Sequence, residues 1–217
     1  CQPWGLAADS VDGGAAAEES TMNAKVIGGV VVAAVLAIGG FYYLRLQQEA
    51  AKWKDAKEIV EESFVKDGAV ANIRYVAVID APLDKVQDAV WAVERGSDMV
   101  ANIKKSTLVK QEGNTKTVEI QLQALSLPLQ QYVMEFTLDP ANHLVNFKTT
   151  QAQAADLVGT YRLETSPDGT RTRLIYDAKS TDKIAIPFPD AVIESANRET
   201  FVNTVRGIEK VVGAPAS

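Results

Sequence analysis

PDAVIESANRETFVNTVRGIEKVVG, residues 189–213, is the stretch that decides the fold of this chain. Its apolar residues recur at three- and four-residue spacing, which is typical of an amphipathic helix: Val192, Ile193, Ala196, Val205, Ile208, Val211 and Val212. Pro189 suits the first turn, and Gly213 followed by Pro215 is a stop signal. A helix of this kind cannot bury its apolar stripe alone, so the preceding chain must supply a partner surface.

The preceding chain is rich in strand signals. Residues 115–124 alternate, with Val118, Ile120 and Leu122 on one side, and other runs share this period of two or their β-former content. One short helix is predicted at 83–93, and 96–102 is irregular or a second short helix. Seven strands are predicted, at 73–79, 103–112, 115–124, 130–138, 143–150, 156–165 and 170–181. This order predicts an α+β fold, an antiparallel sheet covered on its apolar face by the long C-terminal helix.

The N-terminal part has a different composition. Residues 1–21 are rich in Ala, Gly, Ser and acids and are predicted to be disordered. Cys1 is open to two interpretations, the lipidated first residue of a mature bacterial lipoprotein or a position in a fragment or extension upstream of Met22. The favoured interpretation takes Met22 as the natural start.

Residues 26–44 contain no charge, and nineteen residues can cross a bilayer as a helix. We predict a transmembrane anchor at 22–45; the alternatives are a cleaved signal peptide or a buried core helix. Gly29, Ala33 and Ala37 form a stripe of small residues that could bring two anchors together as a homodimer. More basic residues follow the run than precede it, which predicts a single-pass protein with its soluble domain on the cytoplasmic side. The alternative is an exported domain, because a short N-terminal tail with one lysine also suits an anchor whose N-terminus lies inside.

Between anchor and domain, residues 46–68 are predicted to form a helical stalk, because Trp53, Ala56, Ile59, Val60 and Phe64 share one helical face. The soluble domain is then expected at 69–213, with a short tail at 214–217.

Charge and composition exclude several classes of function. A net charge of −6 argues against a nucleic-acid partner, which needs a basic face. One cysteine and one histidine, His143, rule out cysteine-based and multi-histidine metal sites. No nucleophile motif, phosphate loop or dinucleotide fingerprint is present. We therefore predict no catalytic residue, no metal and no cofactor.

Three motifs together resemble the START-like helix-grip superfamily (SRPBCC), which includes Bet v 1-like, polyketide cyclase/dehydrase and lipid-transport proteins. VAVIDAPLDKV at 76–86 is similar to the opening strand and first helix of that superfamily. GTYRL at 159–163 with PDGTRT at 167–172 is similar to its hairpin, and IPFP at 186–189 to the approach to its last helix.

The resemblance implies a curved sheet that grips the terminal helix around a cavity for an apolar ligand. The large inward residues would line it: Trp91, Ile120, Tyr132, Met134, Phe136, Phe147, Tyr161, Tyr176, Phe188 and Phe201. The same residues would equally pack a solid core, and both alternatives stay open. The expected function is a membrane-anchored carrier or binding module for a lipid or other hydrophobic small molecule. The alternatives are a cyclase- or hydrolase-like enzyme with an inward tyrosine as general acid, or a structural interaction domain.

Overall fold

The computed structural model describes residues 41, 43–45, 47–48, 50–125, 127–185 and 187–214. The chain divides into two compact units, Cys1–Lys52 and Trp53–Ser217. Within the described residues, no helix is long and apolar enough to cross a membrane. The segment predicted to be disordered and the predicted anchor lie outside the described residues, apart from Phe41 and 43–45.

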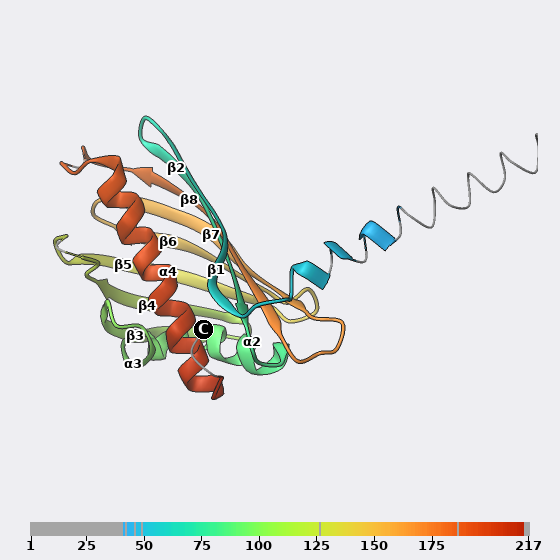
Figure 1. Cartoon of the computed structure of the whole chain (residues 1–217). Helices are drawn as coiled ribbons and strands as arrows, with labels where there is room; N and C mark the ends of the chain where they lie inside the picture. The colour runs from blue at the N-terminus through green and yellow to red at the C-terminus, as the bar shows by residue number, and fades with distance from the viewer. Residues whose placement is uncertain are drawn as a thin grey trace, which may run out of the picture. The chain divides into compact units, whose positions relative to one another are not determined.

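The second unit is built on one eight-stranded antiparallel sheet with the strand order β1-β2-β8-β7-β6-β5-β4-β3 (Figure 1). Its strands are β1 (Lys57–Asp67), β2 (Val70–Ile79), β3 (Ile103–Glu112), β4 (Thr115–Leu122), β5 (Gln130–Asp139), β6 (Leu144–Ala152), β7 (Ala155–Thr165) and β8 (Thr172–Asp182). Between β2 and β3 lie α2 (Leu83–Trp91), the 3₁₀ turn η1 (Val93–Arg95) and α3 (Gly96–Met99). The seven predicted strands and the short helix are confirmed within a few residues at each end.

The last element, α4 (Asp190–Val212), confirms the predicted long helix. Asp190 places a negative charge in its first turn and Lys210 a positive charge in its last turn. Both charges stabilise the helix, because each is opposite in sign to the end of the helix dipole that it lies near. Gly213 ends the helix in the left-handed region, at φ 73°, and its N–H bonds to the carbonyl of Glu209. A glycine at this position avoids the strain that a Cβ would bring.

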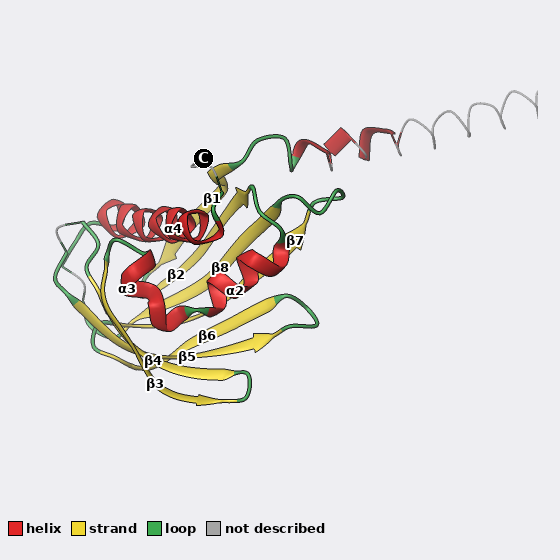
Figure 2. Cartoon of the chain, turned by 90° about the horizontal axis from the view of Figure 1, so that it is seen from below, coloured by secondary structure: helices red, strands yellow, loops and turns green. Residues whose placement is uncertain are grey.

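All the helices of the second unit cover the same face of the sheet (Figure 2). Inward residues of the strands form the core with the apolar stripe of α4, where Phe201, Val205 and Ile208 are buried. Gly207 lets α4 approach α3 closely, because a Cβ there would lie 2.2 Å from the carbonyl oxygen of Met99. The helix-grip architecture expected from the sequence is thus confirmed for this unit.

The predicted helical stalk is wrong from Lys57 onward, because Lys57–Asp67 is the edge strand β1. It pairs antiparallel with β2, with a register shift between Lys57 and Glu61. Ile59 and Phe64 pack against the core, and Glu58 and Glu62 accept hydrogen bonds from Arg206 and Arg198 of α4. The compact unit therefore begins at Trp53, sixteen residues before the predicted boundary at residue 69.

Candidate functional site

A cavity of about 580 Å³ lies between the sheet and the helices. Its walls come from the inward faces of β4–β8, from α2–α3 and from one side of α4. The lining is mostly apolar, and a volume of this size is in the range of ligand pockets rather than of packing defects. Of the two alternatives that the sequence left open, a cavity and a solid core, the structure has the cavity.

The base of the cavity is aromatic. The rings of Phe147 and Tyr176 stack with centroids 5.6 Å apart and an angle of 9° between their planes. The ring centroid of Tyr161 lies 5.1 Å from that of Tyr176 and 5.3 Å from that of Phe147. The ring centroids of Phe136 and Phe147 are 6.1 Å apart. Ring pairs at these distances stabilise one another and give the wall a fixed shape.

Burial keeps the tyrosines of this wall neutral. Desolvation raises the pKa of Tyr161 to about 12 and raises the pKa of Tyr176 well above its usual value of 10. Desolvation also raises the pKa of Tyr132. A hydroxyl whose proton is held this firmly can form hydrogen bonds, but it is a poor source of protons near neutral pH.

Eight of the ten residues predicted to line a cavity do so: Ile120, Tyr132, Met134, Phe136, Phe147, Tyr161, Tyr176 and Phe188. Trp91 and Phe201 do not. Trp91 ends α2, where the Lys116 ammonium lies 4.5 Å from its ring centroid. Phe201 is buried in the core, where the centroid of its ring lies 5.2 Å from that of Tyr75. Whether any of the eight binds a ligand stays a prediction.

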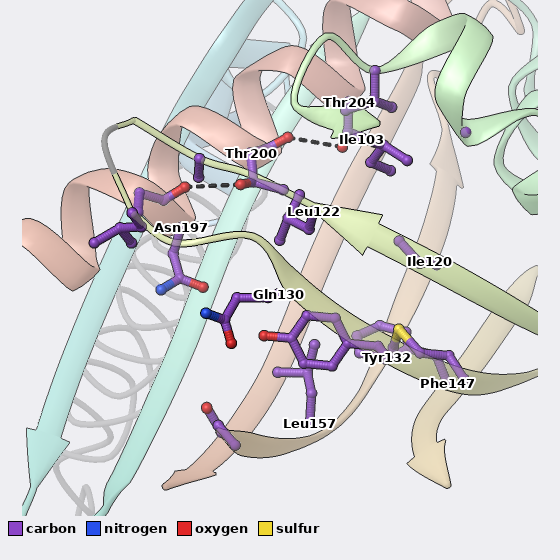
Figure 3. Close-up of a pocket in the computed structure, with 18 of the residues that line it drawn as sticks. Ile103, Ile120, Leu122, Gln130, Tyr132, Phe147, Leu157, Asn197, Thr200 and Thr204 are labelled. Atoms are coloured by element: carbon purple, nitrogen blue, oxygen red, sulfur yellow. Dashed lines mark hydrogen bonds between the residues drawn. The ribbon is translucent and has the colours of Figure 1, made fainter. Parts of the chain in front are cut away.

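Sequence reasoning missed a polar stripe on α4. Asn197, Thr200 and Thr204 line the cavity between Ile193 and Ile208 (Figure 3). The hydroxyls of Thr200 and Thr204 each donate at 2.8 Å to the backbone carbonyl four residues earlier, and the Asn197 amide does the same to Ile193. The signal was present, because these polar residues fall at three- and four-residue spacing between apolar ones.

Two loops surround the mouth of the cavity. Leu129 and Ile184 both line the cavity and are exposed, so the cavity meets solvent between the loop that joins β4 to β5 and the segment before α4. In the described part of the first loop, the Leu125 N–H donates to the carboxylate of Glu199 in α4 at 2.9 Å. Leu125 has a φ of 49°, an uncommon conformation for a residue with a Cβ.

Comparison with solved structures identifies the fold to which this architecture corresponds. The Zhui aromatase/cyclase from Streptomyces sp. R1128 superposes with a TM-score of 0.55 at 18% identity, over 66% of this chain and 92% of that one. A START superfamily protein from Mycobacterium smegmatis gives 0.55 at 12% identity, over 65% and 97%. This chain has the START-like helix-grip fold.

A STAR-related lipid transfer protein from Xanthomonas axonopodis shares the same START-like fold, with a TM-score of 0.54 at 14% identity over 70% of this chain and 98% of that one. No protein-family model and no curated protein matches the sequence. At these identities the likeness concerns the fold, so the site must be interpreted from its own residues.

The other charged and titratable groups near the cavity are few among the described residues. His143 is exposed and hydrogen-bonds to Gln87 at 3.1 Å, away from the lining. Asp182 is the one charged residue among the described lining residues. Its carboxylate forms an ion pair with the Lys66 ammonium, with 3.1 Å between Nζ and Oδ2. In the described part of the chain, no group of three His, Cys, Asp or Glu side chains is placed to hold a metal ion.

Proposed function

We propose that this protein binds a lipid or other hydrophobic small molecule in the cavity beneath α4 and carries it. The observation that carries the proposal is a cavity of about 580 Å³ with an aromatic base and a single, ion-paired charge in its described lining. Burial of an apolar ligand there would gain roughly 25 cal/mol for each Å² removed from water. The fold shared with a STAR-related lipid transfer protein supports the same proposal, whereas the fold shared with an aromatase/cyclase is equally compatible with the enzymatic alternative.

A pair of adjacent substitutions tests this function. Leu157 lines the cavity (Figure 3), whereas Val158, the next residue of β7, is exposed on the other face of the sheet. Leu157→Trp should fill the cavity and lower ligand binding several-fold, and Val158→Trp should leave it unchanged. The measurement is mass spectrometry of organic extracts of the purified full chain, normalised to protein. If no hydrophobic compound co-purifies with the wild type above the level in the Leu157→Trp variant, the proposal is wrong.

The alternatives receive less support. A cyclase-like enzyme would use Tyr132, Tyr161 or Tyr176 as general acid, but burial raises the pKa of each. None of the three forms a hydrogen bond through its hydroxyl within the described residues, so no neighbour there prepares it to give up a proton. A structural domain with a filled core would not need an open volume of this size.

We further propose that residues 26–44 anchor the protein in a membrane and that the START-like domain lies on the cytoplasmic side. Nineteen uncharged residues and the excess of basic residues after them support this. Two anchors could associate through Gly29, Ala33 and Ala37. Protease added outside intact cells should leave the domain undigested, and its digestion would overturn the orientation. Crosslinking with and without Gly29→Leu would test the homodimer.

A further inference from the structure

The polar end of the cavity holds more information about the ligand than its apolar base does. Gln130, Tyr132 and Asn197 come from β5 and α4 and point their polar ends toward one another inside the cavity (Figure 3). All three lie on its lining, opposite a wall that is otherwise hydrocarbon and aromatic. A ligand that fills the cavity would therefore place one polar end at this cluster.

The hydrogen bonds that the two amides already make decide what the cluster offers. Asn197 Nδ2 donates to the carbonyl of Ile193 at 2.8 Å, and Gln130 Nε2 donates to the carbonyl of Pro128 at 3.2 Å. A backbone carbonyl only accepts, so the NH₂ group of each amide must face it. The two side-chain oxygens are then left as acceptors, and each NH₂ group keeps one further N–H. Neither oxygen is bonded within the described residues, nor is the Tyr132 hydroxyl.

The charges around the cavity argue against an anionic ligand. No Lys, Arg or His is among the described lining residues, and Lys66, which contacts the charged lining residue Asp182, is held by Asp182 and Asp190 at 3.1 Å each. A carboxylate or phosphate enclosed here would accept hydrogen bonds from Tyr132 and the remaining amide N–H groups, but no cation in the described lining would neutralise its charge, and the two amide oxygens would repel it. A hydroxyl has the opposite fit, because it donates to one amide oxygen and accepts from Tyr132.

The volume sets a size limit. At about 30 Å³ for each water-sized group, the cavity takes a ligand of roughly 20 heavy atoms. A phospholipid with two acyl chains has more than about twice as many heavy atoms, so it is too large for the cavity. Resting on the proposed function, we infer that the ligand is a neutral hydrophobic alcohol or phenol of about this size, whose hydroxyl binds at Gln130, Tyr132 and Asn197.

The experiment uses photoreactive probes on the full chain in membranes. Diazirine-labelled hexadecane, hexadecan-1-ol and palmitate share one chain and differ in the polar end, and peptide mass spectrometry locates the crosslink. Excess hexadecan-1-ol and excess estradiol, a fused-ring phenol, compete in separate arms. We expect the alcohol to label cavity peptides more strongly than palmitate. Whichever competitor is stronger identifies a linear or a fused-ring ligand.

Matched variants separate the polar cluster from the cavity. Asn197→Leu or Gln130→Leu should lower alcohol labelling about fivefold, the usual effect of losing one hydrogen bond, and leave hexadecane labelling unchanged. Gln131→Leu, on the exposed neighbour in β5, should change neither. Labelling by palmitate equal to that by the alcohol, or variants without effect on the alcohol, would overturn the inference while the carrier function stands. Failure of all three probes to label the cavity would overturn the proposed function itself.

Discussion

The close approach of α4 to α3 gives a prediction in which two known effects have opposite signs. Gly207 lies inside α4, where replacing glycine by alanine normally stabilises a helix by about 1 kcal/mol. Here the added Cβ would lie 2.2 Å from the carbonyl oxygen of Met99 and 2.8 Å from its carbonyl carbon. Both are backbone atoms, so relief requires the two helices to move apart by about 1 Å, and overpacking of this kind costs roughly 3 kcal/mol. The clash should win, with a net loss of about 2 kcal/mol.

The assay is urea unfolding followed by circular dichroism. With a slope of about 2 kcal/mol per M, Gly207→Ala should lower the midpoint by about 1 M. Gly96→Ala in α3 is the matched control, because its Cβ would meet side chains and no backbone atom: the flexible end of Ile103 at 3.2 Å and Ser106 at an ordinary contact distance of 3.5 Å. Its midpoint should stay within about 0.3 M of the wild type. If Gly207→Ala unfolds at the same or a higher urea concentration than the wild type, the steric reasoning is refuted.

Three further predictions concern the boundaries and the tyrosines. A chain that begins at Trp53 should be folded and monodisperse by circular dichroism and gel filtration, whereas one that begins at Ala69 loses β1 and should aggregate; equal behaviour would contradict the revised boundary. Val32→Asp with Leu36→Asp should move much of the protein to the soluble fraction on ultracentrifugation, since each central Asp costs about 2.5–3.5 kcal/mol in a membrane; full retention in the pellet would argue against an anchor. Burial raises the pKa of Tyr161 to about 12, so between pH 10 and 12 the unfolded chain loses a proton that the folded chain keeps, and the free energy of unfolding should fall as pH rises. Urea titrations at pH 9 to 11 should show a fall that is smaller by about 1 kcal/mol in Tyr161→Phe, and an unchanged fall would contradict the burial argument.

The strands from β2 onward could be predicted because each shows a period of two or a high content of β-formers, and α4 because its apolar residues keep the helical period. The strand β1 could not. Its register shift between Lys57 and Glu61 breaks the alternation, so Ile59 and Phe64 both pack against the core although they are five residues apart. That odd spacing, with charges between, imitates the amphipathic pattern of a helix.

The candidate site could be predicted where large apolar residues face inward, and less well where its specificity resides. Selecting large aromatic residues correctly identifies Phe147 and Tyr176 as lining residues. The same criterion also selects Phe201, whose side chain on α4 is buried in the core and does not line the cavity. Gln130 was missed because a single polar residue in a sequence does not show whether it faces solvent or a cavity, whereas Asn197 had a signal in its helical spacing with Thr200 and Thr204. Only the curvature of the sheet over α4 brings the two amides together.

The strand order also has a consequence for how the protein is made. β2 lies between β1 and β8, and Tyr75 is paired with Tyr176, so the first hairpin finds its neighbour only near the end of the chain. At a synthesis rate of roughly 5–20 residues per second, several seconds pass between the synthesis of β2 and that of β8, and the edge of β2 stays unpaired during this time. Contacts so distant in sequence also slow the folding step itself. A ribosome-bound chaperone would therefore have its main task at the nascent β1–β2 hairpin, before α4 has left the exit tunnel.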